Sequence, residues 1–413
     1  MNNRQFSINR PKLQDERTGK FFKGRSEGEN FSRFRFHILM NMRILVAPDS
    51  FKGTATAAEA AAAIALGARR ALGSSPHAAT AQVTTLPMAD GGEGTAEVLA
   101  SAAVHRNDTA GQTITLPTTD AIGRLTEASY QLVGDTAFID VAAATGLPAV
   151  SDALDPLHAD SYGTGVLLAD AESRGAKHIV LGLGGSASID GGLGILAALG
   201  AAAHDSRGYA LPKGGAPLVN LDHIDTAQLN MKAAMMDYTL VTDTRAVPIQ
   251  AATMYGPQKG AEGEQVALLA GAMLKLCEVT DTDPQAEFLG AAGGIPIALS
   301  WLSRTLWGTA EHCRIVPGGR YVADALDLPA RIAEADLVLT GEGRFDEQSL
   351  TGKVVGTLAE MTGPPTLGII AGSATAPAPQ GALLEELGGE GRGDVAQRLS
   401  AAAERLVRSF LQS

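Results

Sequence analysis

The stretch from Gly182 to Gly194 combines residue types that could bind phosphate and move a proton: glycines, serine hydroxyls and a carboxylate. The apolar run before it, 178–181, is typical of a β-strand, and the Ala- and Leu-rich segment after it, 195–203, is typical of a buried helix. At such a strand-to-helix turn, free backbone N–H groups and the positive end of the helix dipole attract anions. The residues that we expect to bind phosphate here are Gly184, Gly185, Ser186 and Ser188.

Asp190 in the same stretch needs a separate explanation, because a plain phosphate cradle requires no carboxylate. A site that binds a metal-bound phosphate, or that deprotonates a hydroxyl group, does require one. We therefore expect Asp190 to be the general base or a metal-orienting carboxylate. The alternative is that Asp190 caps the helix that follows.

The spacing Gly182-x-Gly184-x-x-Ala187 also fits the loose fingerprint of dinucleotide-binding turns, with Asp205 about 20 residues further on. On that interpretation the protein would be an NAD(P)-dependent oxidoreductase of a small hydroxy acid. The position of Asp205 argues against it, because this residue follows a predicted helix and no clear second strand precedes it.

Several other loops repeat this composition, combining glycine with Asp or Glu and often with Lys or Arg. Each follows a predicted strand or opens a predicted helix. Because loops at the carboxyl ends of parallel strands converge, we expect them to form one site for a polyanionic, metal-assisted reaction. The loops are 48–53, 90–94, 182–192, 256–260 and 341–353.

The elements that must position these loops alternate between strand and helix patterns from Met42 onward, which predicts a mostly parallel sheet. Short strand patterns within 112–150 predict an antiparallel element that interrupts this alternation. The Ala-, Pro- and Gly-rich segment 372–393 is expected to be a surface loop. The main predicted strands are 43–47, 82–86, 178–181, 238–242, 335–340 and 366–370, and the main predicted helices are 57–72, 262–277 and 394–411.

The overall charge and composition exclude some function classes. The formal charge of -12 makes the surface as a whole a poor nucleic-acid binder. No run of about 18 uncharged apolar residues predicts a membrane span. The two cysteines have no metal-ligand spacing, and such low usage suits a cytoplasmic protein.

Residues 1–41 differ from the rest, since they contain nine Lys and Arg against four Asp and Glu. They show no apolar core of a secretory signal, and their acidic residues argue against an organelle transit peptide. We expect a disordered or non-native N-terminal extension, with the folded protein beginning near Met42.

Seven blocks, taken together, resemble the bacterial glycerate kinases of the two-domain α/β type, and they occur in order from about Met42 to Ile370. The resemblance implies ATP- and Mg²⁺-dependent phosphorylation of D-glycerate, with the 2-hydroxyl favoured and the 3-hydroxyl left open. A non-catalytic sugar-acid-binding protein on the same fold is the remaining alternative. A homodimer is possible. The blocks are Ala47–Gly53, Pro87–Gly94, Ser161–Gly165, Gly182–Gly192, Tyr255–Gly260, Ala291–Gly294 and Gly341–Lys353.

The expected fold is α/β with two α/β domains and the site in the cleft between them. Residues 42–110 plus 296–413 would form a discontinuous domain with a Rossmann-like parallel sheet. Residues 111–295 would form a domain inserted into it, with a flavodoxin-like sheet plus a short antiparallel element.

The predicted roles divide the charged residues of the loops into groups. Those expected to be catalytic are Asp190, Lys52, Asp49 and Lys353. Those expected to bind the nucleotide phosphates are Gly184, Gly185, Ser186, Ser188 and Lys259. Those expected to bind substrate are Asp90, Arg344 and Ser50, and those expected to bind metal are Asp243, Glu342 and Asp346. The structural alternatives are solvated surface lysines, Asx-turns and a surface salt bridge of Arg344.

Overall fold

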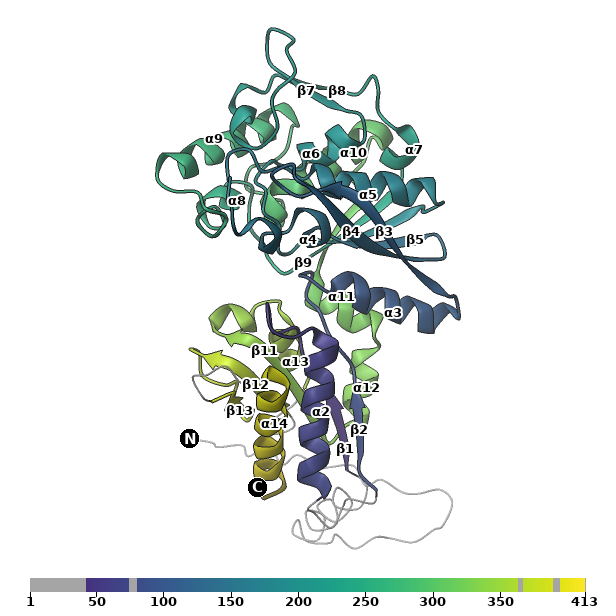
Figure 1. The fold of residues 1–413 in the computed structure, drawn as a ribbon, viewed down its shortest axis with the longest axis vertical. Coiled ribbons are helices and arrows are strands. Elements are labelled where there is room, and N and C mark those ends of the chain that lie inside the picture. Colours follow the sequence, from purple (N-terminus) through teal and green to yellow (C-terminus); the bar gives the residue numbers. More distant parts are fainter. Residues whose placement is uncertain (1–41, 74–79, 363–366, 389–393, 413) are drawn as a thin grey trace, which may run out of the picture.

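The structure is a computed structural model that describes residues 42–73, 80–362, 367–388 and 394–412. Figure 1 shows two lobes, each built around a β-sheet, one above the other along the long axis. The predicted α/β class is confirmed. The extension expected over 1–41 lies outside the described residues.

The lower lobe contains a five-stranded sheet in which every pair is parallel, in the order β13-β12-β11-β1-β2. In chain order this is 2-1-3-4-5, so the flavodoxin-type order lies in the sheet for which a Rossmann-like order was expected. The order changes direction between β1 and β11, where ligands of such sheets bind. The strands are β1 (Arg43–Val46), β2 (Gln82–Thr85), β11 (Leu337–Phe345), β12 (Leu367–Ala374) and β13 (Leu383–Glu386).

Alternate residues of β1 enter two different cores. Ile44 and Val46 pack with α2 (Ala57–Gly73) and α14 (Val395–Gln412) on one face. Leu45 packs on the other face, with α12 (Leu328–Glu334) and α13 (Val354–Met361). β13 lies in the segment expected to be a loop, where pairing with β12 organises it as an edge strand.

The upper lobe contains a six-stranded mixed sheet in the order β10-β9-β6-β5-β4-β3. The strands from β10 to β5 are parallel, and β4 and β3 add antiparallel pairs, which confirms the predicted antiparallel element. The strands are β3 (Gly111–Thr119), β4 (Leu125–Val133), β5 (Thr136–Asp140), β6 (His178–Gly182), β9 (Asp237–Thr242) and β10 (Cys313–Pro317).

Helices cover both faces of the mixed sheet. One face packs against α5 (Tyr162–Ser173), α6 (Leu193–Ala198), α9 (Glu264–Val279) and α10 (Ile295–Trp307). The other face packs against α3 (Thr95–Asn107) and α11 (Gly318–Ala325), which lie between the two lobes in Figure 1. This second core also contains side chains of the parallel sheet, so one apolar layer joins the lobes.

The domain division stays a proposal, and the sheet pairing favours a change in its limits. The expected boundary at 295/296 would separate β10 from β9, with which it pairs, and would separate α10 from the core in which it is buried. We therefore propose that the inserted unit reaches beyond Pro317. The chain would then enter the upper lobe next to α3 and return to the lower lobe next to α11.

The remaining elements are short and connect the main ones. They are α4 (Ala142–Thr145), η1 (Pro148–Val150), β7 (Ala202–His204), η2 (Ala216–Asn220), β8 (His223–Asp225), α7 (Met231–Ala234), α8 (Gln250–Thr253), η3 (Pro257–Lys259), η4 (Ala291–Gly294) and η5 (Glu347–Leu350). The helix expected over 195–203 is shorter, and β7 takes up its last residues. Of the helices that the structure describes, none combines the length and the apolar character of a membrane span.

Candidate active site

Four acidic residues come together at the junction of the lobes, and we call Asp49, Asp90, Asp243 and Glu342 the carboxylate cluster. Asp49, Asp90 and Asp243 follow β1, β2 and β9. Glu342 lies inside β11, which continues beyond the predicted strand end. Asp49, Asp90 and Glu342 are buried, with exposed fractions of 8%, 3% and 6%. Asp90 interacts electrostatically with each of the other three, so the separate loops share one site.

Backbone contacts fix Asp49 and Asp90. The N–H of Asp49 donates to the carbonyl of Gly341 over 2.9 Å, which continues the pairing of β1 with β11 beyond the strand end. The Asp90 loop packs directly against Gly318, because a Cβ on that glycine would lie 1.8 Å from the Asp90 carbonyl oxygen. Only glycine fits at position 318, and the start of α11 therefore sets the position of Asp90.

Burial changes the proton affinity of the cluster. Burial, with the charges of Asp90 and Asp346, raises the pKa of Glu342 to about 7, against opposing effects of Ser349 and Lys353. Burial and Asp90 likewise raise the pKa of Asp243 to about 6. Burial and Asp90 also raise the pKa of Asp49 well above its ordinary value. The cluster is therefore poised to exchange protons near neutral pH.

Two lysines offset this negative charge. Burial alone would lower the pKa of Lys353, but the surrounding carboxylates outweigh it and raise the pKa, so Lys353 stays charged. Lys52 acts electrostatically on Asp49 and Asp243. Both lysines thus act on the carboxylate cluster, and the catalytic role that the sequence predicts for them stays a prediction.

Glu342 contains an unsatisfied atom. Its Oε1 is one of the few buried side-chain oxygens of the described chain without a hydrogen-bond partner. Such an atom costs free energy in the absence of a ligand and is expected at a binding centre. Glu342 is therefore a candidate for contact with a ligand.

The cluster also fits the Mg²⁺ that the resemblance implies. Carboxylate oxygens are ligands that Mg²⁺ prefers, and this ion commonly takes only one or two of them, with phosphate oxygens and water completing its shell. Among the described residues, no group of three His, Cys, Asp or Glu side chains forms a preformed metal cage. The arrangement therefore suits an ion that arrives together with a nucleotide.

Arg344 and Asp346 lie at the edge of this site. Asp346 caps η5, since its side chain accepts a hydrogen bond from the N–H of Gln348 over 3.0 Å. The Arg344 side chain is 71% exposed, and its Nε lies 3.4 Å from Oδ2 of Asp346. A metal role for Asp346 and a substrate role for Arg344 stay predictions, and Asp346 already has a structural partner.

The carboxylate of Asp190 is buried and hydrogen-bonded within the protein. Asp190 is 1% exposed. Its carboxylate accepts hydrogen bonds from the N–H and Oγ of Ser161 over 2.8 and 2.7 Å and from the N–H of Gly194 over 2.9 Å. The Oγ of Ser188 and the N–H of Gly192 donate to it as well. These bonds tie the glycine-rich turn to the start of α5, so the geometry favours a structural role over that of a general base.

Lys259 and the two serines of the turn are also engaged internally. The Nζ of buried Lys259 donates to Oγ of Ser186 over 3.0 Å and to the carbonyl of Ser188 over 2.7 Å. Burial lowers the pKa of Lys259 to about 7, partly opposed by Asp190. The predicted phosphate contacts of Lys259, Ser186 and Ser188 would have to replace these bonds.

The glycines of the turn bring the lobes together. The N–H of Gly184 donates to the Gly91 carbonyl over 2.7 Å, and a Cβ on Gly184 would lie 2.6 Å from the Cα of Gly92. Gly185 has a φ of 79°, which favours glycine. Close backbone packing against the Asp90 loop is therefore sufficient to explain Gly184.

Asp140 is a positioning residue that the sequence analysis missed. Its carboxylate accepts hydrogen bonds from the N–H of Gly94 over 2.8 Å and of Ala96 over 3.0 Å, and so caps α3 from the end of β5. Burial raises its pKa to about 7. Its place at a strand end was the available signal, but it lies in the antiparallel element, outside the glycine-bearing loops.

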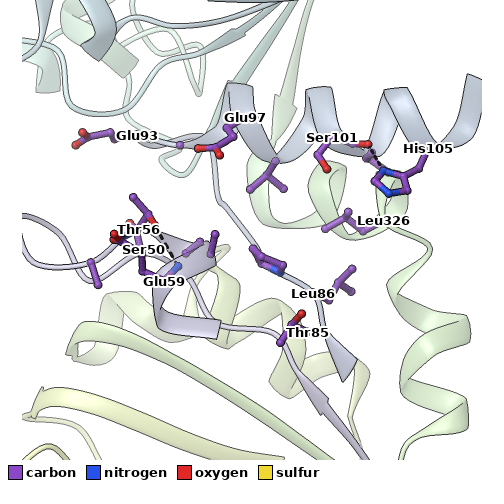
Figure 2. A pocket seen from close by; sticks show the side chains of 18 of the residues that line it. Ser50, Thr56, Glu59, Thr85, Leu86, Glu93, Glu97, Ser101, His105 and Leu326 are labelled. Carbon is purple, nitrogen blue, oxygen red and sulfur yellow. Dashed lines mark hydrogen bonds between the residues drawn. The ribbon is translucent and has the colours of Figure 1, made fainter. Parts of the chain in front are cut away.

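A cavity of about 840 Å³ lies next to the cluster, and Ser50 and Lys52 line it. Figure 2 shows its wall of α3 side chains facing the loop that leads into α2. No local pattern in the sequence predicts this cavity, because its walls come from segments far apart in the chain. The carboxylate cluster, the two lysines and the cavity are together typical of an α/β enzyme that binds a charged ligand at a buried site.

Comparison with known proteins identifies the family. The sequence model of the glycerate kinase family matches residues 44–387. The glycerate kinase of Haemophilus influenzae is 37% identical over 323 residues, which cover 76% of this chain and 80% of that protein. The glycerate 2-kinase of Escherichia coli (strain K12) is 37% identical over 349 residues, which cover 81% of this chain and 86% of that protein.

A crystal structure assigned to glycerate kinase 2 from Salmonella typhimurium LT2 agrees with this. It matches with a TM-score of 0.69 at 34% identity, covering 90% of this chain and 98% of that chain. The chain belongs to the glycerate kinase family, and the prediction of a kinase is confirmed.

The family assignment disfavours the dinucleotide-dependent oxidoreductase, and the fold gives a physical reason. In dinucleotide-binding folds the second acidic residue follows a neighbouring parallel strand. Asp205 instead follows β7, which pairs with β8 in a separate antiparallel sheet. Its carboxylate accepts hydrogen bonds from Arg207 and Tyr209 within its own turn.

The hydrogen bonds of Asp190 make a prediction about stability. Asp190→Ala leaves several buried donors without an acceptor, and should lower the free energy of unfolding by about 3 kcal/mol or more. Thermal or urea unfolding measures this, with Asp225→Ala as the control, since Asp225 is exposed and caps a single N–H. If Asp190→Asn instead kept full stability and lost turnover, the general-base role would be supported over the structural one.

Proposed function

We propose that this enzyme transfers the γ-phosphoryl group of ATP to the 2-hydroxyl of D-glycerate at the carboxylate cluster. The observation that carries the proposal is a buried set of acidic groups with Lys52 and Lys353 beside it, at the strand ends where α/β sheets bind ligands. The relatives named glycerate kinase support the substrate, and the one named glycerate 2-kinase supports the 2-hydroxyl.

Glu342 is the proposed general base. A base works best when its pKa lies near the operating pH, and Glu342 combines a pKa of about 7 with an unpartnered carboxylate oxygen. In the proposed step this oxygen takes the proton of the glycerate hydroxyl. The hydroxyl oxygen then bonds to the γ-phosphorus while the bond between that phosphorus and ADP breaks.

The other charged groups hold the reactants. Lys52 and Lys353 would neutralise phosphate oxygens, and Asp49, whose pKa burial and Asp90 raise, could donate a hydrogen bond to glycerate when protonated. Asp90 and Asp243 would hold Mg²⁺. When bound, that ion would neutralise the negative charge that develops on the phosphates during transfer.

The two cysteines bear on the location of the protein. Cys277 and Cys313 are buried and free, and burial raises the pKa of both thiols, so they are poorly reactive. This suits the cytoplasmic location that the sequence predicts. A homodimer stays a prediction.

The product identifies the reaction. The protein is incubated with ATP, Mg²⁺ and D-glycerate, and proton-coupled ³¹P NMR follows the mixture. We expect ADP and a new phosphomonoester whose signal is split by the single CH proton of 2-phosphoglycerate. Splitting by a CH₂ group would show transfer to the 3-hydroxyl, and the absence of glycerate-dependent ADP would overturn the proposed activity.

The pKa of Glu342 predicts the acid limb of the pH profile. As the pH falls through about 7, Glu342 takes up a proton and cannot act as a base, so kcat/KM should fall there. Because the cluster titrates as a unit, the apparent value belongs to the cluster as a whole. Glu342→Gln should lower kcat by about 10²–10⁴-fold and remove this limb.

Stability provides the control for this variant. Glu342→Gln removes a buried charge, so its melting temperature should equal or exceed that of the wild type. Glu347→Gln, an exposed change five residues further along the chain, should leave rate and profile unaltered. A Glu342→Gln enzyme with normal kcat and an unchanged profile would retire Glu342 as the base.

A further inference from the structure

The cavity beside the cluster is larger than a three-carbon acid requires. We call it the inter-lobe cavity, since its walls are α3, the loop and first turn of α2, the residues that follow β2, and the α11–α12 junction. Its volume of about 840 Å³ lies in the range of pockets that bury a ligand of drug size. A second, larger reactant is the kind of molecule that fits it.

The inter-lobe cavity leads away from the carboxylate cluster. Ser50, at one end, follows Asp49 directly, and Lys52 in the same lining interacts with Asp49 and Asp243. Figure 2 shows Ser50 on the side of Glu93, with His105 and Leu326 at the opposite end. A ligand along this axis would have one end at the cluster and the other between α3 and the α11–α12 junction.

The chemistry of the walls changes along this axis. Hydroxyls and a cation, from Ser50, Lys52 and Thr54, line the end next to the cluster, where the chain enters α2. Beyond it small apolar side chains leave room for a flat group, and charged side chains, among them Glu59, Arg106 and Arg331, lie between them. These apolar residues are Ala58, Leu86, Pro87, Val98, Ala102 and Leu326.

Polar groups occur at intervals along α3. Glu97 lies between the two ends in Figure 2, where its carboxylate can accept hydrogen bonds from the hydroxyls of a sugar. The Nδ1 of His105 lies 2.7 Å from the carbonyl of Ser101, which fixes the imidazole ring at the far end. A fixed aromatic ring beside an apolar wall suits stacking with a heterocyclic base.

We propose that the inter-lobe cavity binds the nucleoside of the phosphoryl donor, with the base between α3 and the α11–α12 junction and the phosphates at Ser50 and Lys52. This inference rests on the proposed kinase function and assigns the donor to a site other than the glycine-rich turn. In that turn Lys259 and Ser186 already bind each other. The cavity would present the terminal phosphate to the carboxylate cluster.

Two alanines of α2 provide a matched pair of variants. Ala58 lines the inter-lobe cavity, whereas Ala62, one turn further along the same helix, does not; both are exposed. Ala58→Trp fills the space that the nucleoside would occupy, and Ala62→Trp places the same side chain outside it. Binding of ADP with Mg²⁺ is measured by isothermal titration calorimetry for the wild type and both variants, with the melting temperature as the check on folding.

We expect Ala58→Trp to raise the Kd for ADP by about tenfold or more, and Ala62→Trp to leave it unaltered. The KM for D-glycerate should be similar in all three proteins. Equal ADP affinity of the two variants, with a wild type that binds ADP, would overturn the cavity assignment and leave the kinase proposal standing. A wild type that neither binds ADP nor forms it from ATP and D-glycerate would overturn both.

Discussion

The structure depends on the burial of several carboxylates in one place. Asp49, Asp90 and Glu342 are buried beside Asp243, and burial together with the charge of Asp90 raises the pKa of Asp49, Asp243 and Glu342. Lys353 remains charged among them because their field outweighs its own desolvation. Such an arrangement is costly for an empty protein and useful for one that binds a polyphosphate and accepts a proton.

The fold holds this arrangement by close backbone contacts between the lobes. The start of α11 lies against the Asp90 carbonyl and leaves room only for Gly318. Asp140, at the end of β5, caps the helix that follows the Asp90 loop. Both contacts come from the mixed sheet and act on a loop that follows β2 of the parallel sheet, and one apolar layer packs between the two sheets. Glycines that suggest phosphate binding in the sequence serve here largely to let backbones meet.

Much of the cluster could be predicted because strand ends are visible in the sequence. Asp49 and Asp243 each follow a predicted strand, and Glu342 follows the strand predicted over 335–340. Because loops at the carboxyl ends of parallel strands converge, these residues were expected to lie together. Four strands of the parallel sheet and the antiparallel element of the other lobe followed from the same patterns, whereas β13 lies in the segment expected to be a loop.

Other features depend on contacts between distant segments. Asp190 was predicted to be catalytic. Its carboxylate instead binds Ser161, which precedes it by 29 residues, and a contact between such distant residues cannot be predicted from the glycine-rich turn alone. Lys259 was predicted to bind phosphate, and its burial follows from packing against that same turn. The expected domain boundary left β10 outside the inserted domain, because the sequence does not show that β10 pairs with β9. The inter-lobe cavity could not be predicted from any local pattern, because distant segments of the chain form its walls.

A crystal structure with ADP, Mg²⁺, D-glycerate and tetrafluoroaluminate, a mimic of the phosphoryl group in transfer, tests the central claim most directly. The account predicts that the mimic lies at the junction of the lobes, within hydrogen-bond distance of Lys353, with the glycerate hydroxyl next to Glu342. A mimic bound at the Gly184–Ser188 turn, with Asp190 turned toward the glycerate hydroxyl, would contradict it.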